Sequence, residues 1–216
     1  MSVENTRTAI DIEHWKRKNH FNFYKDFPDP NFNICFNLDI TVAFQFAKRH
    51  HLSPFLVLMY LSSNACNSVE AFRIRLNKQK KPYIISCVQP SATVANNDGL
   101  FNFCNMQHHN NLSKFIDINS ELVDDSKKAE PLAHIDNDDC QIFYSITPWL
   151  SFTGYKHAKG NSYFDIPKIV FGKFDTTNDK VAMPVSIELH HAIADAIDIA
   201  KYEQSFIKHM SNLALE

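Results

Sequence analysis

Two adjacent histidines, His190 and His191, stand near the end of the chain, and Asp195 follows four residues after the second. They come directly after residues 185–189, where apolar and polar side chains alternate as in a β-strand. An imidazole titrates close to neutral pH and can accept the proton of a hydroxyl that is about to react. A carboxylate one turn later can organise the surroundings of that imidazole. The spacing therefore predicts a general base at the mouth of a strand, beside a supporting charge.

A histidine pair alone is a weak indicator, because the chain has two more, His50-His51 and His108-His109. Such pairs are mostly solvated or hydrogen-bonded at the surface. The 11 histidines could also indicate a metal-binding protein, but the pairs are far apart and adjacent side chains diverge. The five cysteines are scattered and never spaced as metal clips, so we expect no metal site. We expect reduced thiols in a cytoplasmic protein.

The overall composition limits the class of protein. With 216 residues the chain can bury one sizeable core, which favours a single domain. A net charge of −2 and the lack of a basic stripe argue against nucleic-acid binding. Four glycines, the first at Gly99, leave no glycine-rich phosphate loop. No stretch approaches the roughly 18 apolar residues of a membrane span, and the first residues lack the apolar core of a signal peptide. We therefore expect no membrane partner.

The first half of the chain predicts helices and strands in alternation. We expect a short helix at residues 15–24 and a strand at 32–40, where every second residue is apolar. Thr41 is expected to cap a helix that runs to about His50. Ser53 followed by Pro54 is a typical helix start, because the hydroxyl caps free amides and proline fits the first turn. The helix from Pro54 to about Asn67 is apolar nearly all round and should be buried.

The second half continues the mixture. Strands are expected at about residues 71–76, 82–88, 91–95, 142–146, 168–174 and 181–189. Helices are expected at residues 111–126 and, with apolar residues at helical spacing, at about 197–215. Strands interleaved with helices over one core predict an α/β fold, a mixed β-sheet covered by helices.

With this layout, the chain resembles the chloramphenicol acetyltransferase family in four separated segments that occur in the right order. The first segment is residues 11–21 with Phe23-Tyr24, and the second is residues 37–41. The third runs from Ser145 to Trp149 and on to residue 152. The fourth is residues 179–184, leading into residues 190–195. The resemblance covers about residues 9–212.

The resemblance implies a coenzyme A-dependent acyltransferase fold for the single domain 1–216, assembled as a homotrimer with active sites between subunits. It implies acetyl-CoA as co-substrate, no metal, and a small hydroxylated acceptor, with chloramphenicol as the first candidate. The family's general base falls on His191, which would take the proton of the acceptor hydroxyl as its oxygen attacks the thioester. The family's oxyanion-stabilising serine falls on Ser145, before Pro148-Trp149.

Further residues receive roles through the same resemblance. Asp195 and Arg17 match a structural ion pair that holds the catalytic loop. The remaining matches are side chains that contact the two substrates. The acceptor pocket is expected at Phe23, Tyr24, Phe32 and Phe101, and the coenzyme A contacts at Trp149 and Lys173.

The chain also departs from the family pattern. Ala196 stands where the family motif has glycine, which matters if that position needs positive φ. Val170 replaces a threonine that holds a water in well-known members, and Pro28 and Pro30 lie in the pocket-forming loop. Two alternatives therefore stay open: acyl transfer to a different acceptor, or a non-catalytic binding protein on the same fold.

Overall fold

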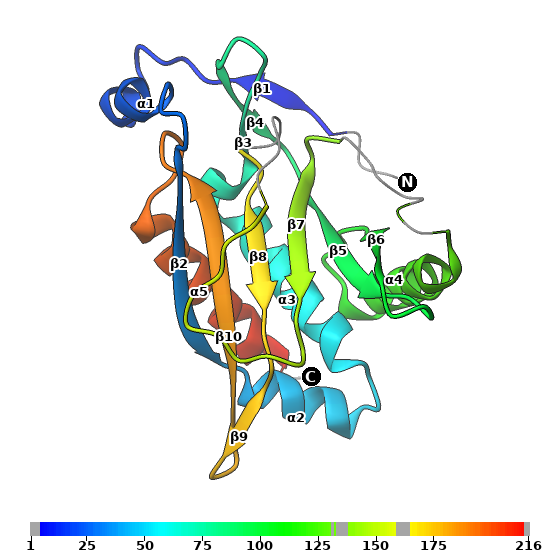
Figure 1. Cartoon of the computed structure of the whole chain (residues 1–216). Coiled ribbons are helices and arrows are strands. Elements are labelled where there is room, and N and C mark those ends of the chain that lie inside the picture. The colour runs from blue at the N-terminus through cyan, green and yellow to red at the C-terminus, as the bar shows by residue number, and fades with distance from the viewer. Residues whose placement is uncertain (1–4, 131, 133–137, 159–164, 214–216) are drawn as a thin grey trace.

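The protein is built on a mixed β-sheet with helices packed mainly on one face (Figure 1). The computed structural model describes residues 5–130, 132, 138–158 and 165–213. The helices are α1 (Lys18–Tyr24), α2 (Thr41–Arg49), α3 (Pro54–Ser68), a 3₁₀ turn (Glu70–Arg73), α4 (Leu112–Lys128) and α5 (Ala196–Leu213). The strands are β1 (Arg7–Ala9), β2 (Asn31–Asp39), β3 (Ile74–Leu76), β4 (Pro82–Ile85), β5 (Gln89–Ala95), β6 (Phe101–Asn105), β7 (Gln141–Ile146), β8 (Lys168–Phe171), β9 (Asp175–Thr177) and β10 (Lys180–His190).

The main sheet has the strand order β2-β10-β8-β7-β5-β6, with β9 paired to the start of β10. β7 lies parallel to both β8 and β5, whereas β10 is antiparallel to β2 and β8. A separate sheet of the order β1-β4-β3 lies beyond the start of β8 (Figure 1). The mixed sheet covered by helices is the architecture that the sequence predicted.

The main core lies between the large sheet and its helices. In Figure 1, α3 and α5 run behind the sheet, and they pack against each other. Alternate residues of β10, among them Val185, Ile187 and Leu189, are buried in this core, while Ser186 and Glu188 occupy the opposite face. α3 begins as predicted: the Ser53 hydroxyl accepts a hydrogen bond from the Leu56 backbone, and the helix is buried on most sides.

The start of α2 differs from the prediction. Thr41 does not cap this helix, because it is itself the first helical residue and Ile40 precedes it. The Asp39 carboxylate accepts hydrogen bonds from the Thr41 N–H at 3.0 Å and from its hydroxyl at 2.6 Å. The Thr41 hydroxyl accepts in turn from the Val181 N–H at 2.9 Å. Asp39 therefore orders the turn, and Thr41 fastens it to β10.

Other differences concern short or irregular strands. The predicted strand at 71–76 is a 3₁₀ turn up to Arg73 and a strand only from Ile74, and the strand at 82–88 ends at Ile85. β1 and β9 were not predicted, because each has three residues and all are exposed. β6 was missed because its polarity is inverted: Asn102 is buried and donates to the Ser126 and Ala129 carbonyls. None of the described helices is long and apolar enough to span a membrane.

Candidate active site

The His191 turn follows directly on the last residue of β10. The N–H groups of Ile193 and Ala194 donate to the His190 carbonyl at 3.0 and 3.1 Å, which closes a tight turn. The His191 N–H donates to the Pro30 carbonyl at 2.8 Å and joins this turn to the segment before β2. These bonds engage the main chain of the turn. The His191 side chain lies half-buried at the surface of the turn.

One imidazole nitrogen of His191 is occupied by the protein itself. Its Nδ1 lies 3.2 Å from the Ala194 carbonyl oxygen, which can only accept a hydrogen bond. A proton on Nδ1 therefore donates to this carbonyl, and Nε2 is left as the nitrogen with a free lone pair. This tautomer is the one that a general base acting through Nε2 requires.

Aromatic rings fix the plane of the imidazole. Tyr24 stacks on His191 with ring centroids 4.1 Å apart and an interplanar angle of 15°. Phe32, on the adjoining strand β2, lies 4.6 Å from the same imidazole. Phe23 precedes Tyr24 and contacts its ring at 4.8 Å. The structure thus brings together His191 and three of the four expected pocket residues.

The guanidinium group of Arg17 stabilises the His191 turn. It forms an ion pair with the Asp195 carboxylate at 2.6 Å, so the two residues expected to pair do contact each other. It also donates to the carbonyls of Ala192, His191 and Ala194 at 3.1, 2.9 and 2.6 Å. Burial would raise the pKa of Asp195, but the hydrogen bond and charge of Arg17, together with the hydrogen bond from the Ile197 N–H, keep the pKa below its usual value. Charge-assisted hydrogen bonds of this kind fix three main-chain carbonyls and one carboxylate within residues 191–195, around the imidazole.

His190 plays a different part from His191. Its side chain is buried, and its Nδ1 accepts a hydrogen bond from the Ala192 N–H at 3.2 Å. Burial lowers the pKa of His190 to about 4, so this imidazole is neutral near pH 7. His190 therefore supports the turn, whereas the imidazole of His191 remains within reach of a substrate.

Ser145 lies far from His191 within one chain. It pairs with Val170 on β8, which pairs with Ser186 on β10, so two strand spacings separate Ser145 from β10. His191 lies five residues beyond Ser186. With about 4.8 Å between strands and about 3.3 Å per residue, Ser145 and His191 stand roughly 19 Å apart. One chain alone does not bring the two expected catalytic residues together.

A groove opens at the carboxyl ends of β5 and β7, on the face of the sheet that the helices cover. It has a volume of about 380 Å³ and is lined by Thr93, Ile146 and Trp149 together with residues of α3 and α4. The Ser145 side chain alternates with Ile146 along β7 and lies on the opposite face of the sheet. Trp149 is 69% exposed, which is unusual for a side chain of this size. The N–H of Lys173 donates to the Leu150 carbonyl at 2.9 Å, so both expected coenzyme A contacts lie on adjoining loops at this end of the sheet.

A close approach of main chains builds these loops. A Cβ atom on Gly172 would lie 2.6 Å from the Pro184 side chain and 2.8 Å from that of Phe152. Glycine at this position therefore lets the loop after β7 pack against the end of β8, which positions Trp149. Phe101, in contrast, begins strand β6 at the edge opposite β2, so it is remote from His191 in the same chain.

Two departures from the family pattern can now be placed. Ala196 is the first residue of α5, and positive φ does not occur there, so alanine causes no strain at this position. Val170 is fully buried between Ser145 and Ser186 in the register of the sheet. Its side chain offers no hydrogen-bonding group on the sheet face that carries Ser145.

The comparisons with known proteins show the family of this chain. A family model described as chloramphenicol acetyltransferase matches residues 5–207. The chain belongs to the chloramphenicol acetyltransferase family. Among curated relatives, a chloramphenicol acetyltransferase of Escherichia coli is 28% identical over 199 residues, which cover 90% of this chain and 89% of that protein.

Solved structures lead to the same fold. A chloramphenicol acetyltransferase structure superimposes with a TM-score of 0.84 at 25% identity and covers 95% of this chain and all of that one. A dihydrolipoamide acetyltransferase of Azotobacter vinelandii has a TM-score of 0.66 at 14% identity, with 91% of this chain and 86% of that one covered, and shares the fold. The acyltransferase fold and the acetyltransferase class expected from the sequence are confirmed.

Sequence reasoning missed three contributors to the site of this acetyltransferase family member. The carbonyls of Pro30 and Ala194 hold His191 through main-chain oxygens, and no residue type marks such a carbonyl in a sequence. Phe27 contacts both Phe23 and Tyr24 through its ring. The four-residue spacing between Phe23 and Phe27 could have indicated this contact.

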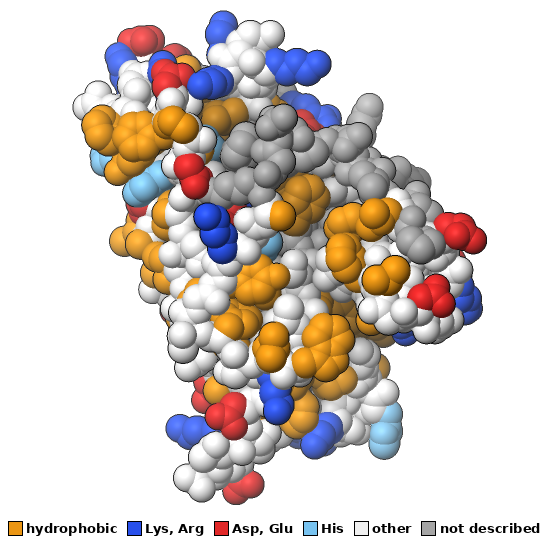
Figure 2. All heavy atoms as spheres, in the orientation of Figure 1, with side chains coloured by type: hydrophobic (Ala, Val, Ile, Leu, Met, Phe, Trp, Pro, Cys, Tyr) orange, Lys and Arg blue, Asp and Glu red, His pale blue; other side chains and the backbone are white. Residues whose placement is uncertain are grey.

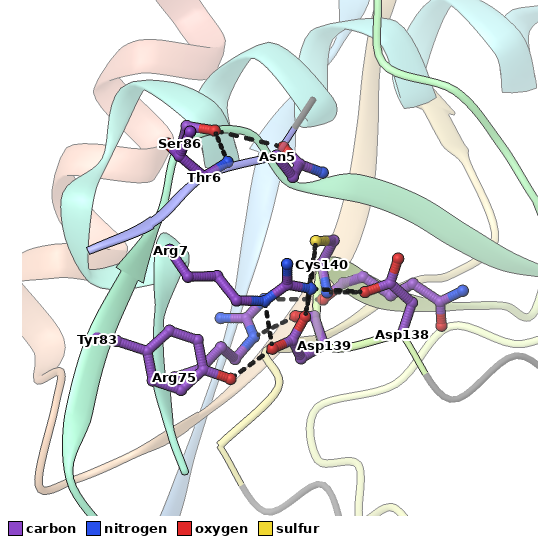
Figure 3. Close-up of polar contacts among 10 residues, drawn as sticks. Asn5, Thr6, Arg7, Arg75, Tyr83, Ser86, Asp138, Asp139 and Cys140 are labelled. Atoms are coloured by element: carbon purple, nitrogen blue, oxygen red, sulfur yellow. Dashed lines mark hydrogen bonds and ion pairs between the residues drawn. The ribbon is translucent and has the colours of Figure 1, made fainter. Parts of the chain in front are cut away.

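A second polar cluster lies at the start of β7 (Figure 3). Asp138, Asp139 and Cys140 place potential metal-ligand atoms within 4.8 Å of one another. Arg7 from β1 bonds the Asp139 carboxylate at 3.0 Å, and the Tyr83 hydroxyl donates to the same carboxylate. Burial would raise the pKa of Asp139, but these bonds hold it well below its usual range. The carboxylates are thus engaged in fastening β1 to β7.

Proposed function

We propose that this protein transfers the acetyl group of acetyl-CoA to a hydroxyl of chloramphenicol or of a similar small acceptor. Family membership supports acetyl transfer, and the arrangement of His191 supports a role as general base. The observation that carries the proposal is the Nδ1 contact of His191 with the Ala194 carbonyl, which leaves Nε2 free to accept a proton. We take residues 1–216 as one acetyltransferase domain, with a cytoplasmic location in keeping with its five free cysteines.

In the proposed reaction, Nε2 of His191 accepts the proton of the acceptor hydroxyl while the oxygen attacks the thioester carbonyl carbon. Negative charge develops on the carbonyl oxygen, and the Ser145 hydroxyl donates a hydrogen bond to it. One such donor contributes on the order of 3 kcal/mol in comparable sites. When the tetrahedral intermediate collapses, the bond to sulfur breaks and the proton from His191 passes to the departing thiolate. No covalent enzyme intermediate is needed.

The two substrates approach from different ends of the sheet. We assign the acceptor to the aromatic surface of Phe23, Tyr24 and Phe32, and the pantetheine arm of acetyl-CoA to the groove beside Trp149. The 380 Å³ volume of this groove and the largely exposed ring of Trp149 at its edge support that assignment. Lys173, on the adjoining loop, can bind a phosphate group of acetyl-CoA.

We further propose a homotrimer in which His191 of one subunit meets Ser145 of the next. The separation of roughly 19 Å within one chain supports this arrangement, because a single subunit cannot place both groups on one substrate. Phe101 is remote from His191 in its own chain, so in the trimer it would line the acceptor pocket beside His191 of a neighbouring subunit. Closed rings formed by identical head-to-tail interfaces are a common form of assembly.

Thiol release from acetyl-CoA tests the proposal directly. Purified protein should release coenzyme A only when chloramphenicol is present, and a reaction without acceptor is the control. His191→Ala should lower kcat by roughly 10²- to 10⁴-fold, and Ser145→Ala by roughly 10²-fold with little change in acceptor binding. His14→Ala serves as a control for histidine loss, since the His14 side chain is 86% exposed. Absence of thiol release by the wild-type protein would refute chloramphenicol as acceptor.

A further inference from the structure

The three rings of Phe23, Tyr24 and Phe27 form a closed triangle at the end of α1. Their centroids are 4.8, 5.3 and 5.1 Å apart, and the pairs meet edge-on or tilted, which are favourable aromatic geometries. Of the three, Tyr24 packs against the small core beneath it. Phe23 and Phe27 are 64% and 42% exposed. We call these two exposed rings the aromatic shelf.

The aromatic shelf continues the site of the proposed reaction. Two steps of 4.1 and 5.1 Å between ring centroids lead from His191 through Tyr24 to Phe27, so Phe27 lies no more than about 9 Å from His191. Figure 2 shows hydrophobic side chains gathered over α1, at the upper left of the molecule. A small acceptor can therefore place a hydroxyl at the imidazole while another part of it covers the shelf.

The shelf is held in place before any ligand arrives. The Phe27 N–H donates to the Tyr24 carbonyl at 3.1 Å. Pro28 and Pro30 follow and restrict the backbone, and an ion pair between Asp26 and Lys80 at 2.8 Å ties this end of α1 to the turn between β3 and β4. A rigid surface of two exposed rings loses little conformational entropy when a flat apolar group lies on it.

Resting on the proposed function, we propose that Phe27 is a specificity-determining residue, which selects acceptors carrying an aromatic ring close to the hydroxyl that is acetylated. The chemistry of the shelf argues for an aromatic occupant. Ring faces and edges are the groups it presents, and a further ring extends the tilted contacts already present among its members. Chloramphenicol, a nitrophenyl diol, is the probe of this class.

The test compares Phe27→Ala with Ile207→Ala, because Ile207 is equally exposed at 42% but lies on α5. Phe27→Ala should raise KM for chloramphenicol by about five- to tenfold, with kcat changed less than twofold. An acceptor with the same amide and diol but no ring should show no change in KM. Phe27→Leu should be intermediate, and Ile207→Ala should match the wild type.

Equilibrium binding of chloramphenicol, measured by calorimetry, separates this inference from the proposed function. If the wild type binds chloramphenicol through Phe27 but releases no thiol, the shelf stands and the proposed reaction falls. If thiol release is intact and Phe27→Ala changes neither KM nor affinity, the shelf is refuted. Equal losses in kcat for both acceptors, or a change in oligomer mass by light scattering, would make Phe27 a structural or subunit contact. Failure of the wild type to bind chloramphenicol also refutes the shelf.

Discussion

Two arginines, Arg17 and Arg75, hold two regions of this molecule by the same device and with different results. Each guanidinium reaches four oxygen-bearing partners. Those of Arg17 lie within the single stretch of residues 191–195. Those of Arg75 are the carbonyls of residues 72, 74, 139 and 141, which come from two segments far apart in the chain. Arg17 therefore orders one turn, whereas Arg75 joins two parts of the fold.

The two side chains also differ in their surroundings. Arg17 is paired with the Asp195 carboxylate and retains 15% side-chain exposure. Arg75 is fully buried, and each of its hydrogen bonds goes to a neutral carbonyl. Burial lowers the pKa of Arg75, while the nearby carboxylate of Asp165 opposes that shift. From this difference we expect Arg17 to matter more for the reaction than for folding, and Arg75 to matter more for folding.

The largest effect on stability should come from Arg75→Met. The substitution leaves four buried carbonyls without their donor and the partly buried Asp165 without its nearby charge, so the free energy of unfolding should fall by about 3–5 kcal/mol. Urea denaturation measures this loss. Arg73→Met is the matched control, since Arg73 is less buried and bonds the Ile85 and Ser86 carbonyls. Equal losses in the free energy of unfolding for the two variants would show that Arg75 contributes no more to folding than Arg73.

Arg17→Gln should affect activity more than stability. We expect kcat to fall by roughly 10²-fold, because the turn that orients His191 loses its fork, while the free energy of unfolding falls by about 1–2 kcal/mol. Thiol-release kinetics and urea denaturation on the same preparation give both numbers. In a double-mutant cycle with Asp195→Asn, the combined loss should be smaller than the sum of the single losses. Additive losses would contradict the coupling that the ion pair implies.

The Arg17 region should also carry a pH dependence through His190. Its pKa is about 4 in the folded protein, below the 6.5 of an unperturbed histidine. The unfolded chain therefore binds more protons, so stability is complete above about pH 6.5 and declines by up to about 3 kcal/mol as the pH falls towards 4. His190→Asn keeps an acceptor for the Ala192 N–H and should flatten this decline. Urea denaturation at pH 7.5 and 4.5 checks it; an unchanged decline would assign the effect to other groups.

Ala196→Gly should have the smallest effect. Residue 196 begins α5 without positive φ, so glycine gains nothing from its conformational freedom and should lower the free energy of unfolding by no more than about 1 kcal/mol. Acetyl transfer should be unchanged. A gain in either quantity would show that the family's glycine has a benefit that this backbone does not reveal.

The same contrast explains what could be predicted from the sequence. The long elements α3, α4, α5, β2 and β10 were predicted because their apolar spacing is regular over many residues. Arg17 and Asp195 were found as members of a recurring motif. Arg75 was not singled out, because a lone arginine in a short run gives no sign of being buried. The inverted polarity of β6 likewise reflects a tertiary contact with the end of α4, which overrides the local pattern.

The site itself was only partly predictable. Residue types pointed to His191 and the family resemblance to Ser145, but no residue type marks the main-chain oxygens of Pro30 and Ala194 that hold His191. The order of strands decides the distance between the two side chains. That order depends on which strands pair. Local apolar periodicity predicts the strands, but it does not predict which strands far apart in the chain pair with each other.

The separation of His191 and Ser145 within one chain has a genetic consequence. If each reaction centre draws its base from one subunit and its oxyanion donor from the next, then a gene lacking one and a gene lacking the other encode complementary products. Neither product works alone. In a random mixed assembly, about a quarter of the interfaces would unite an intact His191 with an intact Ser145. Two null alleles expressed together would then restore a growing cell's activity in part, a form of rescue that a site confined to one chain cannot give.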